Sequence, residues 1–183
     1  MMVSEFRDSA NKYAQALNGI IALHDLPPRL FREADHFGFA CASPEGYERR
    51  VAEVLSASNT VCEINRQNRR VAIALLNARI AIERFSAETE VSTIEILEPT
   101  PDQPNPGSGV RFMGFVFRDI LPLSRLLETR DIDYTMEGNG TYGAVVLPFG
   151  DQQSQVKFTN KTLSLVAKER LEDGTARIIR RAA

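Results

Sequence analysis

The sequence predicts an α+β fold built from two copies of a strand–helix–strand–strand–strand unit, preceded by an N-terminal helix. Three observations support this prediction: apolar spacing switches between helical and strand periods, the same order of elements occurs twice, and a stretch rich in proline and glycine separates the copies. We assign residues 1–32 to an N-terminal helical extension, 33–99 to the first unit, 100–109 to a linker and 110–183 to the second unit.

The N-terminal extension shows the apolar spacing of one helical face, and Pro27 limits how far that helix can extend. The residues of this face are Phe6, Tyr13, Leu17, Ile20 and Ile21. The helix belongs to neither unit, so its apolar face needs either the rest of the chain or a partner to cover it.

The first unit opens with a strand over residues 35–41, whose side chains alternate between two faces. The apolar side chains share the face that we expect to pack on helices, namely Phe37, Phe39 and Cys41. His36 therefore points to the other face. Ser43 and Pro44 have the residue types of an N-cap and a first helical residue. Strands are predicted next over residues 60–65, 70–81 and 91–97.

The second unit repeats this order. A helix capped by Asp119 follows its first strand, and Gly138-Asn139-Gly140 has the composition of a tight hairpin turn. Its strands are predicted over residues 111–117, 133–137, 142–147 and 154–159. A terminal helix over residues 163–171 is expected to end at Gly174.

Composition limits the class of protein. With 183 residues the chain can form one domain with its own core. A formal net charge of −2 provides no basic face, so no nucleic-acid partner is expected. No apolar run is long enough to cross a membrane and no signal peptide is visible, so a cytoplasmic protein is expected. Arg177, Arg180 and Arg181 are interpreted as a frayed, solvated tail, and Cys41 and Cys62 as core residues.

The two units also match in letters, since residues 36–41 and 112–117 both have glycine third and phenylalanine fourth. With this repeat, Ala34-Asp35-His36, Ile94-Glu95-Ile96-Leu97-Glu98-Pro99 and Val156-Lys157-Phe158-Thr159 resemble the vicinal-oxygen-chelate superfamily. That superfamily includes glyoxalase I, bleomycin-resistance proteins and extradiol dioxygenases. The chain looks most like its YecM-like branch, which also carries a helix before the first module. The resemblance implies that both βαβββ modules form one cupped mixed sheet.

The resemblance further implies a divalent metal in the cup, held by four side chains from the first and last strands of each module. His36 and Glu95 match two of these positions, and Glu98 is a reserve ligand on the opposite face of its strand. Phe112 matches a third position and cannot ligate. The last strand offers no acidic or imidazole side chain toward the cup, only Gln155, Lys157 and Thr159. Asp35 falls on the helix side of its strand, so we do not expect it to orient His36.

Both candidate ligands also have a purely structural interpretation. A histidine at the start of a strand is commonly hydrogen-bonded for stability alone, and Glu95 suits a solvated polar face. Tight catalytic zinc sites use three protein ligands, which two residues do not supply.

Three hypotheses follow. The first is a small organic ligand bound in the cup beside a degenerate metal site, with Arg111, Gln155, Lys157 and Thr159 as binding residues suited to a carboxylate. The second is a lyase, isomerase or dioxygenase that depends on Zn, Ni, Mn or Fe, with Glu137 or Asp151 completing the ligand set. The third is a protein-interaction module, with a homodimer or another partner docked on the N-terminal helix. No catalytic residue is assigned, and whether the protein is an enzyme stays open.

Overall fold

The computed structural model describes residues 2–66, 68–84, 87–105, 107–117, 119–139, 142–150 and 154–179. Its elements, in chain order, are α1 (Met2–Leu23), the 3-10 helix η1 (Pro28–Phe31), β1 (Ala34–Ala40), α2 (Pro44–Leu55), β2 (Ser58–Arg66), β3 (Arg69–Arg84), β4 (Ala87–Leu97), β5 (Gly109–Val116), α3 (Ile120–Thr129), β6 (Thr135–Asn139), β7 (Tyr142–Phe149), β8 (Ser154–Thr159), α4 (Leu163–Glu172) and β9 (Ala176–Ile178). The predicted α+β class and the repeated order of one strand, one helix and three strands are confirmed.

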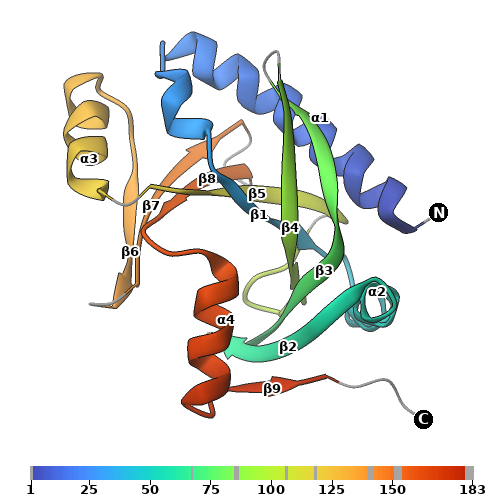
Figure 1. Cartoon of the computed structure of the whole chain (residues 1–183). Helices are drawn as coiled ribbons and strands as arrows, with labels where there is room; N and C mark the ends of the chain where they lie inside the picture. Colours follow the sequence, from blue (N-terminus) through green and yellow to red (C-terminus); the bar gives the residue numbers. More distant parts are fainter. Residues whose placement is uncertain are drawn as a thin grey trace.

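Both modules contribute to one mixed sheet, whose strand order is β6-β7-β8-β5-β1-β4-β3-β2-β9. Within each module the first strand pairs parallel with the last, β1 with β4 and β5 with β8. The modules meet where β1 pairs antiparallel with β5 (Figure 1). The first strands of both modules therefore lie side by side at the centre of the sheet.

The main core lies between one face of the sheet and helices α1, α2 and α3. The predicted alternation is confirmed in β1, because Phe37 and Phe39 are buried in this core. Phe6 of α1 packs edge-on against Phe39, with ring centroids 4.9 Å apart. The apolar face of α1 is thus covered by the chain's own sheet, which removes that face as a surface for a partner. Burying one phenylalanine contributes about 1.5–3 kcal/mol.

Helix α2 begins as predicted, with Ser43 as N-cap. Its hydroxyl accepts a hydrogen bond from the backbone N–H of Gly46 at 3.1 Å, and Pro44 opens the helix. Asp119 stands at the N-cap position of α3, but its side chain makes no capping hydrogen bond. Of the predicted turn at Gly138-Asn139-Gly140, Gly140 lies outside the described residues.

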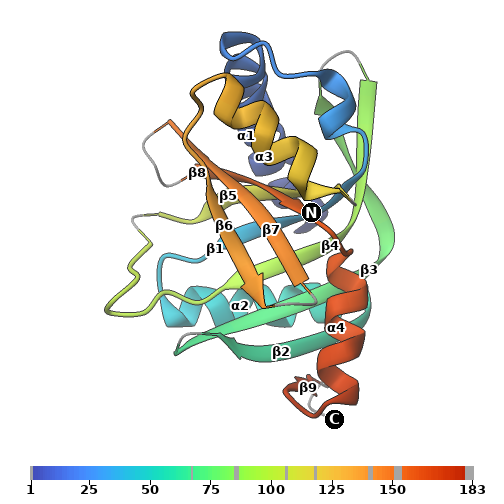
Figure 2. The ribbon, with the colours of Figure 1, turned by 90° about the vertical axis from the view of Figure 1, so that its left-hand side faces the viewer.

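Helix α4 packs on the other face of the sheet. Leu163 and Ala167 of α4 form a small apolar cluster with Cys62 of β2 and Ile73 of β3. Figure 2 shows α4 near β2 and β9, below α1 and α3 in this view. The helix therefore closes one end of the concave face.

The prediction of a frayed basic tail is wrong for Arg177. After Gly174, which has a left-handed φ of +75°, the chain forms β9 and pairs with β2. Arg177 Nε donates to the carboxylate of Glu63 at 3.0 Å. Glu63 is buried and needs such partners, and this need was invisible in the local sequence. Arg180 and Arg181 lie outside the described residues.

Among the described helices, none combines the length and apolar character that a membrane crossing requires.

Candidate functional site: a charged cup on the concave face

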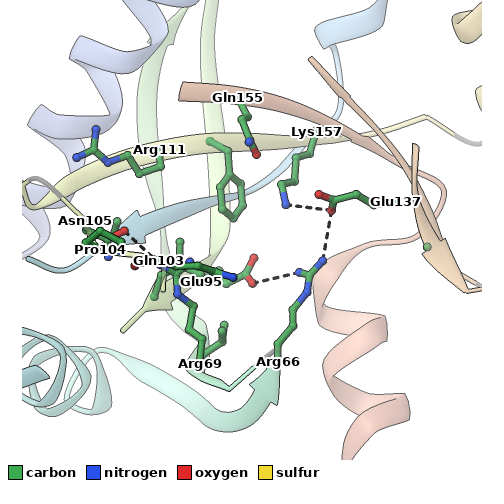
Figure 3. Close-up of a pocket in the computed structure, with 15 residues that line it drawn as sticks. Arg66, Arg69, Glu95, Gln103, Pro104, Asn105, Arg111, Glu137, Gln155 and Lys157 are labelled. Carbon is green, nitrogen blue, oxygen red and sulfur yellow. Dashed lines mark hydrogen bonds and ion pairs between the residues drawn. The ribbon is translucent and has the colours of Figure 1, made fainter. Parts of the chain in front are cut away.

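Two adjoining pockets hollow the concave face of the sheet. The larger has a volume of about 680 Å³ and the smaller about 500 Å³, both within the usual range of small-molecule sites. Four residues line both pockets: Arg66, Glu95, Gly138 and Lys157. The pockets are therefore two compartments of one cup, and Figure 3 shows the larger compartment.

The larger compartment has walls from both modules and from the predicted linker. Gln103 and Asn105 of that linker line the pocket and are held by Arg69, whose Nη2 donates to Gln103 O and to Asn105 Oδ1 at 3.2 Å each. Asn105 Nδ2 in turn donates to the backbone oxygen of Cys41 at 2.7 Å. The segment that separates the modules is thus also part of the cup.

A row of alternating charges crosses the cup from one module to the other. Arg66 Nη1 lies 3.9 Å from Glu95 Oε1, and Arg66 Nη2 lies 3.3 Å from Glu137 Oε2. Lys157 Nζ lies 3.3 Å from that same oxygen of Glu137. Figure 3 shows this row between β2 and β4 on one side and β6 and β8 on the other.

Lys157 is the most deeply buried cation of the cup, with 11% of its side chain exposed. Its ammonium lies 4.5 Å from the centroid of the Phe112 ring, close enough for a cation–π contact. Glu137 is the one hydrogen-bond acceptor that the described residues supply to Nζ. Because an ammonium has three N–H donors, Lys157 keeps bonding capacity for a further acceptor.

Two arginines of the larger compartment make no ion pair with the described residues. Arg69 has a buried Nε without an acceptor, and Arg111 Nη2 donates to Gly107 O at 3.1 Å. Figure 3 shows the Arg111 guanidinium at the edge of the pocket, on the side of Asn105 and away from Lys157. Burial lowers the pKa of Arg69 and Glu95 opposes the shift, but a guanidinium stays charged at neutral pH.

The lining of the larger compartment is therefore electropositive. Among the described residues that line it, four cationic side chains accompany two carboxylates, those of Glu95 and Glu137. The apolar part of the lining comes from Ala40, Val71, Leu97 and Phe112. Such a surface suits a small molecule with a hydrocarbon body and negative charge.

His36 lines the smaller compartment and is 2% exposed. Its Nδ1 lies 2.8 Å from Asp35 Oδ2, so the expectation that Asp35 would not orient His36 is wrong. The β1–β5 register shifts between Ala34 and His36, and such a bulge redirects the side chain that alternation alone would place on the helix side.

The neighbours of His36 fix its ring. Asp35 Oδ2 also accepts the backbone N–H of Leu163 in α4 at 2.7 Å, so this oxygen is an acceptor and Nδ1 of His36 carries the proton. A Cβ on Gly114 would lie 2.1 Å from Cε1 of His36, so the ring packs directly on that glycine. Nε2 is left on the side of Glu95, facing the cup.

Glu95 shares the space in front of Nε2. Its Oε2 lies 4.0 Å from His36 Nε2, too far for a hydrogen bond between them. Tyr142 also lines this compartment, and burial, with a smaller effect from Glu95, raises the pKa of its phenol well above the usual value. His36 Nε2 and the Glu95 carboxylate therefore face one space, which a small ligand group could enter between them.

The residues present do not fit a tightly held divalent metal. Among the described residues, no three histidine, cysteine or acidic side chains form a cluster that could hold an ion. Glu137 is engaged by Arg66 and Lys157, and Glu98 by two hydrogen bonds from Arg70 at 2.5 and 2.9 Å. Asp151 lies outside the described residues.

The remaining predicted binding residues are split. Gln155 and Lys157 line the larger compartment, as Arg111 does. Thr159 is fully buried, its hydroxyl donates to Lys161 O at 2.9 Å, and it lines neither compartment.

Sequence reasoning assigned no role to Arg66 and Arg69, because both fall between the strands predicted over residues 60–65 and 70–81. The available signal was strand alternation: Cys62, Ile64 and Arg66 share one face of β2 once that strand is extended beyond residue 65.

The strand register makes the two modules equivalent about a local two-fold axis. In the β1–β5 pair, His36 opposes Gly114 and Gly38 opposes Phe112, with Phe37 opposite Met113 at the midpoint. In the parallel pairs, Gly38 aligns with Glu95 and Gly114 with Lys157. His36 and Glu95 of the first module thus correspond to Phe112 and Lys157 of the second.

Comparison with known proteins supports this architecture. Protein EC4020, a structural-genomics target, superposes with a TM-score of 0.74 and 13% identity, covering 92% of this chain and 92% of that chain. Methylmalonyl-CoA epimerase from Mycobacterium tuberculosis superposes with a TM-score of 0.50 and 15% identity, covering 74% of this chain and 91% of that chain. No protein-family model and no curated protein matches the sequence. The paired modules, the shared cup and these superpositions together show that the chain has the vicinal-oxygen-chelate fold.

Proposed function

We propose that the protein binds a small organic anion in the larger compartment of the cup. The observation that carries this proposal is the electropositive lining, in which the buried ammonium of Lys157 has bonding capacity to spare and the Arg69 guanidinium makes no ion pair with the described residues.

The chemistry of the lining suits a carboxylate on a short hydrocarbon body. The side chains of Arg69, Gln155 and Lys157 are donors for carboxylate oxygens. Phe112 and Leu97 offer apolar contact for the body of the ligand. The proposal concerns binding and assigns no reaction.

The test is calorimetric titration with malonate, succinate and inorganic phosphate at fixed ionic strength, with uncharged malonamide as the control ligand. Lys157→Met is the key variant. Lys168→Met is its matched control, because Lys168 is a surface lysine of α4 with 72% of its side chain exposed. We expect at least one anion to bind, malonamide not to bind, and Lys157→Met to weaken anion binding roughly 10-fold. Equal affinities in both variants, or no anion binding at all, would overturn the proposal.

The second candidate function is that of a divalent-metal-dependent lyase, isomerase or dioxygenase with His36 and Glu95 among its ligands. The orientation of His36 by Asp35 favours it, because metal-binding histidines commonly hydrogen-bond a carboxylate through the other ring nitrogen. Further ligands would have to come from the substrate or from Asp151.

Metal content by mass spectrometry tests this candidate, after dialysis against Mn, Fe, Ni and Zn in turn. About one metal ion per chain, lost in His36→Ala, supports it. Protein free of metal after every dialysis rejects it and leaves the anion proposal untouched.

A further inference from the structure

We infer that Glu137 is an internal competitor for the ligand: its carboxylate occupies the place, between Arg66 and Lys157, that a carboxylate of the bound anion takes. The inference rests on the proposed function and names the subsite at which the anion binds. At that subsite Arg66 and Lys157 are the two cations that bind the anion, and Glu137 is the side chain that the anion displaces.

The geometry of the shared carboxylate is the first support. A single oxygen, Oε2 of Glu137, accepts from both Arg66 Nη2 and Lys157 Nζ, at 3.3 Å each. Charge-assisted hydrogen bonds of this kind are typically about 2.7–2.9 Å long. A free carboxylate, unconstrained by a strand, can present one oxygen to each cation at that shorter distance.

The distribution of burial is the second support. The side chain of Glu137 is 36% exposed, whereas that of Lys157 is 11% exposed. The ammonium is therefore fixed in the cup while the carboxylate stands at its margin. Moving Glu137 into water costs little free energy, because ion pairs of a partly exposed carboxylate contribute little.

The position of Glu137 in the sheet is the third support. It belongs to β6, one of the two edge strands of the nine-stranded sheet, which pairs with β7 on one side. Lys157 belongs to β8, which has strands on both sides. A local shift of an edge strand breaks fewer hydrogen bonds than a shift of an interior strand, so Glu137 can leave without disturbing the core.

Displacement has a consequence for ligand selection. With Glu137 moved out, Glu95 is the one carboxylate left among the four cations of the larger compartment. A monoanion only replaces the negative charge of the carboxylate that it displaces. A dianion replaces that charge and brings a second one, which reaches Arg69. The subsite therefore favours small dicarboxylates over monocarboxylates.

The experiment is a calorimetric titration of succinate into the unaltered protein, Glu137→Gln and Glu172→Gln, at one ionic strength. Glu172→Gln is the matched control, because it removes the same charge from an exposed site of α4. We expect Glu137→Gln to bind succinate roughly 10-fold more tightly than the unaltered protein and Glu172→Gln to stay within about twofold. In Glu137→Gln/Lys157→Met the gain should vanish.

The outcomes separate this inference from the proposed function. Succinate binding that is unchanged or weaker in Glu137→Gln overturns the inference and leaves the anion site standing. Absence of binding in every variant overturns both. Circular dichroism of each variant confirms that it is folded before titration.

Discussion

The first and second modules have the same order of elements and the same strand pairing, but opposite chemistry at equivalent places in the cup. The first module presents an imidazole and a carboxylate, His36 and Glu95, and the second presents a phenyl ring and an ammonium, Phe112 and Lys157. On the helix side the equivalent residues are apolar and buried in both modules. These pairs are Phe37 with Met113, Phe39 with Phe115, Ile94 with Val156, and Ile96 with Phe158.

This difference shows that the fold requires apolar side chains on one face of the sheet and permits different side chains on the other. A buried apolar face must stay apolar, because a polar side chain without a partner there costs several kcal/mol. The concave face lines a pocket that can hold a ligand. A carboxylate in one module can therefore be replaced by an ammonium at the equivalent position of the other. At the equivalent positions, the first module presents side chains that can ligate a cation, and the second presents an ammonium that attracts an anion.

The largest effect that the equivalence predicts is on stability, at the two glycines on which the equivalent rings pack. In Gly114→Ala the new Cβ would lie 2.1 Å from His36, and in Gly38→Ala 2.1 Å from the Phe112 ring. Both rings are buried, so each variant should lose about 2–3 kcal/mol in urea unfolding. Gly19→Ala is the control, because its Cβ meets nothing within 4 Å.

Rescue shows whether the clash is the cause. Adding His36→Ala to Gly114→Ala should recover part of the lost free energy of unfolding, as should adding Phe112→Ala to Gly38→Ala. Unfolding curves of both glycine variants that match that of Gly19→Ala would contradict the packing of each ring on its glycine.

The second prediction converts one half of the cup into the other. Phe112→His combined with Lys157→Glu places an imidazole and a carboxylate at both equivalent positions. The double variant should bind Zn²⁺ on the order of 100-fold more tightly than the unaltered protein, because it doubles the number of available ligands. Titration against a competing chelator measures the affinity. If the double variant binds Zn²⁺ no more tightly than the unaltered protein does, the ligand side chains of the two modules do not lie close enough to share one ion.

A smaller effect concerns an ion pair of the first module, between Glu98 at the end of β4 and Arg70. The hydrogen bonds from Arg70 hold the pKa of Glu98 below its usual value. A lowered folded-state pKa stabilises the protein above the unfolded pKa, near 4.3, and this contribution is lost as the pH falls through the folded value.

Glu98→Gln should therefore cost about 1–2 kcal/mol at pH 7 and progressively less below pH 4. Chemical unfolding from pH 3 to pH 7 measures the difference. A cost that does not change with pH would show that the pair contributes through packing rather than through charge.

The smallest predicted effect is at the junction of the C-terminal strand with the first module. Arg177 has 74% of its side chain exposed, and Glu63 keeps its hydrogen bond from Tyr47 at 2.8 Å when Arg177 is removed. Arg177→Ala should cost under about 1 kcal/mol, as exposed ion pairs do. Thermal unfolding that shows a cost above twice this value would mean that β9 is essential to the first module.

Features with a local signal could be predicted from the sequence. Strand alternation placed His36 and Glu95 on the concave face, and the Ser43-Pro44 pair marked the start of α2. The order of elements identified the repeat, because helical and strand periods are properties of short segments.

Features that depend on contacts between segments far apart in the sequence could not be predicted from it. Arg66 and Glu137 are 71 residues apart and meet only when the modules pair. Asp35 reaches His36 because of a bulge that alternation does not show, and β9 has only three residues. Asn105 becomes part of the pocket because the linker folds back over the sheet.

The anion site is tested most directly by locating a bound dianion. Crystals soaked in selenate, an anomalous scatterer with two negative charges, can be compared between the unaltered protein and Lys157→Met. The account predicts an anomalous peak inside the larger compartment, in contact with Lys157 and either Arg66 or Arg69, and no such peak in the variant. Peaks confined to the outer surface, or a pocket peak that persists without Lys157, would contradict it.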